Sequence, residues 1–130
     1  MGYRSDVAYT IRFVSDHDEK NKQSFYTFLA EAKSKAATAH CFTEVEVDEV
    51  RLRINFAVDD VKWYPSYPDV ACHEALLDLA DEWANDESNN SEVAYRFVRI
   101  GEEPEDIETK TGGDASWDWV NVHRSIERDW

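Results

Sequence analysis

The order in which hydrophobic periodicity changes along the chain constrains its fold more than any other feature of the sequence. Four segments alternate apolar and polar residues, which is the pattern of half-buried strands: residues 7–13, 41–47, 50–56 and 93–100. In two others, residues 25–36 and 70–83, apolar residues recur every three or four positions, which predicts helices with one buried face. The predicted order is therefore strand, helix, strand, strand, helix, strand.

This order is that of the split β-α-β, or ferredoxin-like, arrangement within the α+β class. Right-handed crossovers would place both helices on one face of an antiparallel sheet. Asp48 and Glu49 leave room only for a tight turn between the second and third strands, so these two strands are expected to form a hairpin.

Two further strands are predicted after the fourth one. Residues 107–111 and 117–126 alternate again on either side of Gly112 and Gly113, and paired glycines favour a turn. They are expected to form an extra C-terminal β-hairpin that continues the sheet from the fourth strand.

The sheet face turned away from the helices is predicted to be polar, because the strand phases place charged side chains there. Opposite charges on neighbouring strands would partly neutralise one another. This face would be solvated or covered by the tryptophan-rich tail. Its expected residues are Thr10, Arg12, Glu44, Glu46, Arg51, Arg53 and Arg96.

The length of 130 residues matches one domain, residues 1–130. Hydrophobic residues make up 42% of the chain, which excludes a disordered composition and suffices for a core without a disulfide or a metal. The chain shows no internal repeat.

The net charge of −14 bears on the class of partner. Such an acidic excess repels nucleic acids and anionic membranes, so neither is expected as a direct partner, and it favours a partner with a basic surface. The alternative is that the charge serves solubility alone. With no signal-peptide pattern and no long apolar run, the sequence favours the cytoplasm.

Two cysteine–histidine neighbours, His40-Cys41 and Cys72-His73, raise the question of a zinc site. Residues 40 and 41 would face opposite sides of a strand, and residues 72 and 73 would diverge by about 100° on a helix. We therefore predict no metal site and expect two buried free thiols. His17, between two aspartates, is interpreted as part of a helix cap.

None of the sequence motifs for phosphate binding, dinucleotide binding or a serine nucleophile occurs. The sequence thus predicts no catalytic residues and no cofactor, and it favours a binding protein over an enzyme. A catalytic pair built from distant residues would leave no such trace.

Acidic and aromatic residues form the predicted interaction surface. Aromatic side chains dominate binding hot spots, and clustered carboxylates suit a basic groove, although an acidic turn can also simply be solvated. The predicted residues are Glu102, Glu103, Glu105, Asp106 and Glu108, together with Tyr64, Tyr67, Trp117 and Trp119.

Three segments carry a resemblance to a known group of proteins. Residues 1–7, 61–70 and 97–103 read MGYRSDV, VKWYPSYPDV and FVRIGEE. Together they resemble a family of small bacteriophage and prophage proteins that starts Met-Gly-Tyr-Arg-Ser and has no assigned activity. The resemblance implies a phage accessory protein that acts in the cytoplasm of the bacterial host.

The leading hypothesis is a non-enzymatic accessory protein that binds a host protein through its acidic and aromatic surface. Three alternatives stay open. They are an acidic nucleic-acid mimic that blocks a host DNA- or RNA-binding protein, a small-molecule binder or enzyme with a pocket between residues 63–67 and the acidic turn, and a virion component. The sequence leaves the oligomeric state open, including a homodimer.

Overall fold

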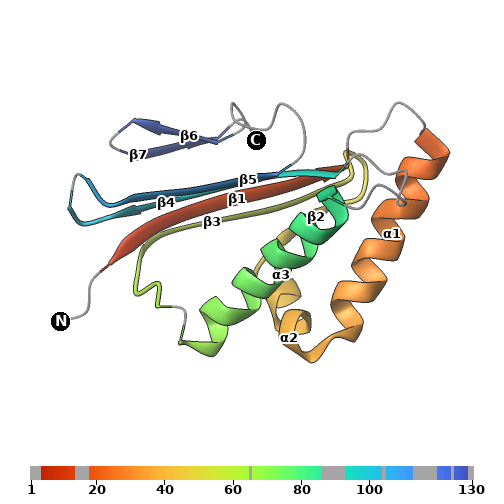
Figure 1. Cartoon of the computed structure of the whole chain (residues 1–130), viewed down its shortest axis with the longest axis horizontal. Coiled ribbons are helices and arrows are strands. Elements are labelled where there is room, and N and C mark those ends of the chain that lie inside the picture. Colours follow the sequence, from red (N-terminus) through yellow and green to blue (C-terminus); the bar gives the residue numbers. More distant parts are fainter. Residues whose placement is uncertain are drawn as a thin grey trace.

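The computed structural model describes residues 4–13, 18–64, 66–85, 93–103, 105–112, 120–123 and 125–128. Within these ranges the elements follow one another in the order shown in Figure 1. They are β1 (Ser5–Phe13), α1 (Asp18–Ser34), α2 (Ala36–Ala39), the 3-10 helix η1 (His40–Thr43), β2 (Glu46–Asp48), β3 (Arg53–Val61), α3 (Pro68–Asn85), β4 (Val93–Gly101), β5 (Ile107–Gly112), β6 (Val120–His123) and β7 (Ser125–Arg128). His17, Trp117 and Trp119 lie outside the described residues.

The main sheet has five antiparallel strands in the order β2-β3-β1-β4-β5. The long helices α1 and α3 lie on one face of this sheet, and the β6–β7 hairpin lies on the other (Figure 1). The predicted α+β class is confirmed, as are the two helices and the strands at β1, β4 and β5. No helix among the described residues is long and apolar enough to span a membrane.

The predicted polar sheet face is buried at its centre. β1 lies between β3 and β4, and the β6–β7 hairpin contacts β1 and β4. Thr10 and Arg12 are therefore only 0% and 3% exposed. Their polar atoms are satisfied internally, because Thr10 donates to Asn55 Oδ1 (2.6 Å) and Arg12 Nε donates to Thr10 Oγ1 (3.2 Å). This face was predicted to be either solvated or covered by the C-terminal tail. At β1 it is covered.

The predicted strand over residues 41–47 is wrong in its first half. Residues 40–43 form a 3-10 helix, and only Glu46–Asp48 pair with β3. The physical reason is tertiary packing: Cys41 is fully buried in the core and Thr38 donates back to the Ala32 carbonyl, so the chain leaves α1 as short helical turns rather than as a strand.

The turn after β2 is longer than predicted. Asp48 Oδ1 accepts from the backbone N–H groups of Val50 (3.1 Å) and Arg51 (3.0 Å), and Leu52 follows with a φ of 57°. An aspartate that bonds the backbone two residues ahead favours such a turn over continued strand pairing. Val50, in the first part of the predicted strand over residues 50–56, is consequently 92% exposed.

The predicted C-terminal hairpin pairs differently. β5 pairs with β4, from Ile107 opposite Ile100 to Gly112 opposite Tyr95. β6 and β7 pair with each other, with Val122 opposite Ile126, and form a separate two-stranded sheet. The predicted single strand over residues 117–126 is therefore wrong: its described residues 120–123 form β6, and residues 125 and 126 belong to β7. An alternating pattern cannot tell one strand from two strands joined by a very short turn.

The helices pack on the sheet through an aromatic cluster. The ring of Phe13 on β1 makes edge contacts with Phe25 and Phe28 on α1, at centroid distances of 5.4 and 5.6 Å. Trp83 on α3 contacts Phe13 (6.1 Å) and Phe28 (5.4 Å). Such edge-to-face pairs add to the stabilisation from apolar burial. This cluster joins β1, α1 and α3 at one end of the core.

Gly112 at the end of β5 allows close approach of the Tyr95 ring. A Cβ at this position would lie 2.3 Å from Tyr95 Cε1. We expect Gly112→Ala to lower the free energy of unfolding by about 1–3 kcal/mol, the usual range for overpacking. Denaturant unfolding measures this change. Thr109→Ala, at an exposed position of the same strand, is the control and should change stability by no more than about 0.5 kcal/mol.

Candidate functional site

The acidic turn between β4 and β5 is partly neutralised by one arginine. Arg99 donates to Asp106 (Nη2–Oδ1, 2.8 Å) and to Glu108 (Nε–Oε1, 3.1 Å), and also to Ser5 Oγ (3.1 Å). The hydrogen bonds to Asp106, more than any other interaction, raise the pKa of Arg99. Asp106 and Glu108 thus tie the turn to the sheet, which leaves them less suited to a docking role.

The other acidic residues of this turn lie nearer the surface. Glu102 and Glu105 are exposed, and Glu102 Oε1 accepts from the backbone N–H of Arg4 (3.0 Å). Glu103 is also exposed. The predicted interaction surface therefore divides into two carboxylates bound by Arg99 and three at the surface.

The predicted tyrosines lie on the connection between β3 and α3. Tyr64 and Tyr67 pack edge to face, with their ring centroids 5.2 Å apart, and Tyr67 is 43% exposed. Tyr67 lines a pocket of about 470 Å³, to which no described residue of the acidic turn contributes. A pocket therefore lies beside residues 63–67, but it is not the predicted one between these residues and the acidic turn.

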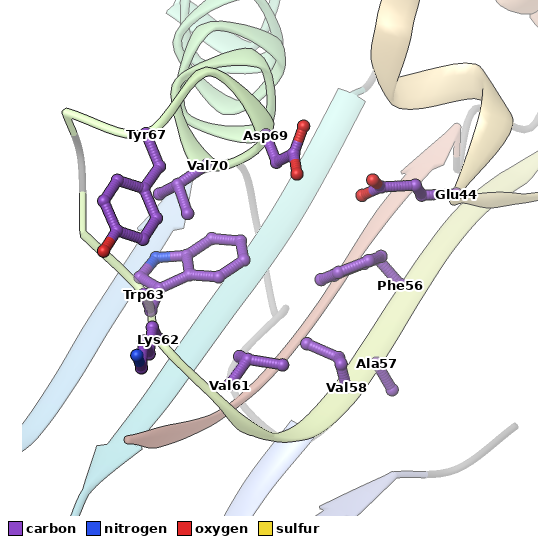
Figure 2. A pocket seen from close by; sticks show the side chains of 10 residues that line it. All are labelled: Glu44, Phe56, Ala57, Val58, Val61, Lys62, Trp63, Tyr67, Asp69 and Val70. Atoms are coloured by element: carbon purple, nitrogen blue, oxygen red, sulfur yellow. The ribbon is translucent and has the colours of Figure 1, made fainter. Parts of the chain in front are cut away.

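The pocket is open, and its walls come from β3, the residue after η1, the connection between β3 and α3, and the start of α3 (Figure 2). Aromatic and aliphatic side chains form its floor, and two carboxylates stand on one side of it. The lining residues are Glu44, Phe56, Ala57, Val58, Val61, Lys62, Trp63, Tyr67, Asp69 and Val70. A volume in this range suits a small ligand or a single inserted side chain.

Trp63 forms the central wall of this pocket. Its ring lies near Phe56 (6.0 Å), His73 (5.6 Å) and Phe97 (6.4 Å), and Figure 2 shows its six-membered ring turned toward Phe56. Its Nε1 is buried and has no hydrogen-bond partner among the described residues. A buried indole N–H normally finds an acceptor, so this donor is an exception among the described residues.

Behind the pocket, His73 connects a buried tyrosine to Glu44. Tyr9 Oη lies 2.6 Å from His73 Nδ1, and His73 Nε2 lies 2.7 Å from Glu44 Oε2. Burial lowers the pKa of His73, although Glu44 opposes this effect, so the imidazole is neutral at pH 7. Because a carboxylate only accepts, Nε2 carries the proton and donates to Glu44, while Tyr9 donates to Nδ1.

The two carboxylates of the pocket lie close together. Oxygen atoms of Glu44 and Asp69 lie within 4.8 Å of one another and of a ring nitrogen of His40. His40 Nε2 is 3.4 Å from Asp69 Oδ1 and 3.9 Å from Glu44 Oε1. Figure 2 shows Lys62 beside Trp63, across the pocket from the Glu44 carboxylate. The carboxylate side of the pocket is thus suited to a cation.

Sequence reasoning missed Glu44, Phe56, Asp69 and His73 as site residues. Glu44 was expected on the open sheet face, but the 3-10 helix turns it toward α3. The one sequence signal was the proline-flanked aromatic segment, in which Tyr64 and Tyr67 were predicted as binding residues. The remaining residues converge only through the packing of η1 against α3.

Both cysteines converge with His73, although the prediction was that the neighbours Cys72 and His73 would diverge on their helix. Donor atoms of Cys41, Cys72 and His73 all lie within 4.8 Å of one another. Cys41 lies on η1 rather than on a strand, which changes the direction of its side chain. Desolvation by burial is the first cause that raises the pKa of both thiols, so both are protonated at pH 7.

Comparison of the chain with protein-family models, with curated proteins and with solved structures found no match. The geometry of the pocket and of the side chains around it is therefore the basis on which a function is inferred.

Proposed function

We propose that this protein is a binding protein that recognises an arginine side chain on a basic segment of a partner protein. The observation that carries the proposal is the pocket in which Trp63, Phe56 and Tyr67 face the carboxylates of Glu44 and Asp69. Aromatic faces attract cations, and adjacent carboxylates bind the forked N–H groups of a guanidinium. The two features together match arginine more closely than any neutral ligand.

Arginine fits this pocket better than lysine because of its shape. A guanidinium is planar, stacks on aromatic rings and presents several N–H donors in a fixed fork, whereas an ammonium is a compact and strongly hydrated charge. Glu44 Oε2 lies 2.7 Å from His73 Nε2, whereas Glu44 Oε1 and Asp69 Oδ1 lie 3.9 and 3.4 Å from His40 Nε2. A guanidinium in the pocket would share these two oxygens with His40. The net charge of −14 would draw a basic partner toward the protein over longer distances.

The resemblance to bacteriophage and prophage proteins supplies the biological setting of this proposal. The protein would act in the cytoplasm of the bacterial host, on a host protein, as a non-enzymatic accessory protein. We also propose that the fold is ferredoxin-like. Two features support this: the strand order β2-β3-β1-β4, and the positions of α1 and α3 along the chain, which match the split β-α-β pattern.

Nucleic-acid mimicry receives less support. It requires carboxylates spaced along one surface and free to replace phosphates. Arg99 holds Asp106 and Glu108, and Lys110 holds Glu74 at 2.7 Å. Because these three carboxylates are paired with cations, they are not free to replace phosphates.

A peptide titration tests the proposal. A short glycine–serine peptide with one arginine is compared with the same peptide carrying citrulline, which keeps the shape and removes the charge. NMR follows the indole N–H signal of Trp63. We expect the arginine peptide to shift this signal in a saturable manner. The variant Glu44→Gln/Asp69→Asn should weaken binding about 2- to 30-fold, because it removes two exposed carboxylate–guanidinium pairs and each contributes about 0.2–1 kcal/mol.

Glu102→Gln/Glu105→Gln on the acidic turn is the matched control. It removes the same number of charges as the pocket variant, but from surface acids outside the pocket, and should leave binding within a factor of about two at physiological salt. Equal binding of the citrulline peptide, or an equal loss in both double variants, would refute recognition of a guanidinium by this pocket.

A further inference from the structure

Three soft or borderline metal ligands meet in the interior, next to the pocket but not part of its arginine site. Cys41 on η1 and Cys72 and His73 on α3 are 0%, 4% and 0% exposed, and their donor atoms lie within 4.8 Å of one another. We propose that Cys41, Cys72 and His73 bind one Zn²⁺ ion.

The donor set fits zinc by its chemistry. Zinc takes thiolate and imidazole ligands at about 2.0–2.3 Å in a tetrahedral arrangement, in which neighbouring donor atoms lie roughly 3.3–3.8 Å apart. The three donor atoms lie within 4.8 Å of one another and would move closer together to reach this spacing. A hard cation such as Mg²⁺ prefers oxygen ligands and would not select two cysteines.

The fourth position has a ligand within reach. Glu44 Oε2 already touches His73 Nε2 at 2.7 Å, so its carboxylate or a water molecule completes the tetrahedron. The histidine would turn one ring nitrogen to the metal and keep a hydrogen bond from the other, to Tyr9 or Glu44, as metal-bound histidines usually do. Tyr9 orients the ring where Nε2 binds the metal; where Nδ1 binds it, Glu44 orients the ring and a water molecule is the fourth ligand.

The ion has a route to the site. A second pocket of about 410 Å³ is lined by Cys72, His40 and Asp69, among other residues, so one thiol is reached from the surface past a histidine and a carboxylate. Binding replaces the protons of the two thiols, which pass to solvent, and leaves two thiolates on the metal. No oxidation or reduction takes part.

Metal content and cobalt spectroscopy test this inference on the full chain without a polyhistidine tag. Protein purified from zinc-supplemented cells should contain about one zinc per chain. Protein stripped with chelator and kept reduced should bind Co²⁺ with thiolate-to-cobalt charge-transfer bands, and zinc should displace the cobalt. Zinc should also raise the melting temperature of the stripped protein, because the ion binds the folded state.

Cys41→Ser/Cys72→Ser is the site variant, and near-ultraviolet circular dichroism reports whether it folds. We expect it to retain less than about a tenth of the metal and to lose the charge-transfer bands. Glu102→Gln/Glu105→Gln should behave like the wild type, which excludes adventitious binding to surface acids.

The wild type alone can overturn the proposal, whatever the double variant does. Folded and reduced wild-type protein that shows no thiolate bands with excess Co²⁺, and no change in melting temperature with zinc, has no such site. The arginine titration uses metal-free protein and exposed carboxylates, so either proposal can fail while the other stands.

Discussion

Phe28→Ala is expected to reduce the free energy of unfolding by about 3–5 kcal/mol, which is a large share of the 5–15 kcal/mol typical of a domain. Phe28 is 0% exposed and its ring contacts Phe13 on β1 and Trp83 on α3. Truncation removes the burial of the ring and leaves a cavity where α1, β1 and α3 meet. Chemical denaturation followed by circular dichroism measures the change.

Tyr26→Ala is the matched control for this variant. Tyr26 is also an aromatic residue of α1, but it is 48% exposed. Its loss should cost no more than about 1 kcal/mol, because little apolar surface returns to water. Similar losses for the two variants would mean that the Phe28 cluster does not hold the helices on the sheet.

His73→Ala is expected to cost about 3–5 kcal/mol in metal-free protein, because two penalties add. The substitution empties the space of a ring that packs 4.2 Å from Phe56, and it leaves the buried hydroxyl of Tyr9 without its acceptor. Tyr9→Phe by itself is expected to cost about 1–3 kcal/mol, since His73 Nδ1 then has no donor. Thermal and denaturant unfolding in the presence of chelator measure the loss of stability in both variants.

A double-mutant cycle separates the hydrogen bond from the packing. In Tyr9→Phe/His73→Leu both polar partners are replaced by apolar groups of similar size, and such a replacement can be nearly neutral. We expect the double variant to be more stable than the sum of its single variants predicts, by about 0.5–3 kcal/mol. Strict additivity would show that Tyr9 and His73 contribute independently, contrary to the hydrogen bond between them.

The two proposals place different demands on Glu44. In the arginine pocket its carboxylate faces the ligand, and behind the pocket it accepts from His73 Nε2. A metal ion on Cys41, Cys72 and His73 would draw this carboxylate inward or leave it with a bound water. Zinc is therefore expected to alter the affinity for the arginine peptide, and the titration repeated with zinc measures that coupling.

The sequence by itself determined the elements whose periodicity is long and regular. These elements are the nine-residue strands β1 and β4 and the helices α1 and α3 with their apolar stripes. Their sequences leave little choice of structure, because burying one face of a strand or helix requires apolar residues at a fixed spacing. Their order limits the sheet to few topologies. The proline-flanked aromatic segment also predicted Tyr67 as a surface residue, and its side chain is 43% exposed.

Only the tertiary structure decided the short elements and the side chains that converge from them. Residues 40–43 alternate like a strand, yet burial of Cys41 against α3 holds them in a 3-10 helix, and this turn brings Glu44 to Asp69 and Cys41 to Cys72 and His73. In a segment of a few residues, local preference differs by less free energy than packing one side chain supplies. That is why the pocket and the thiol cluster could not be read from residue spacing.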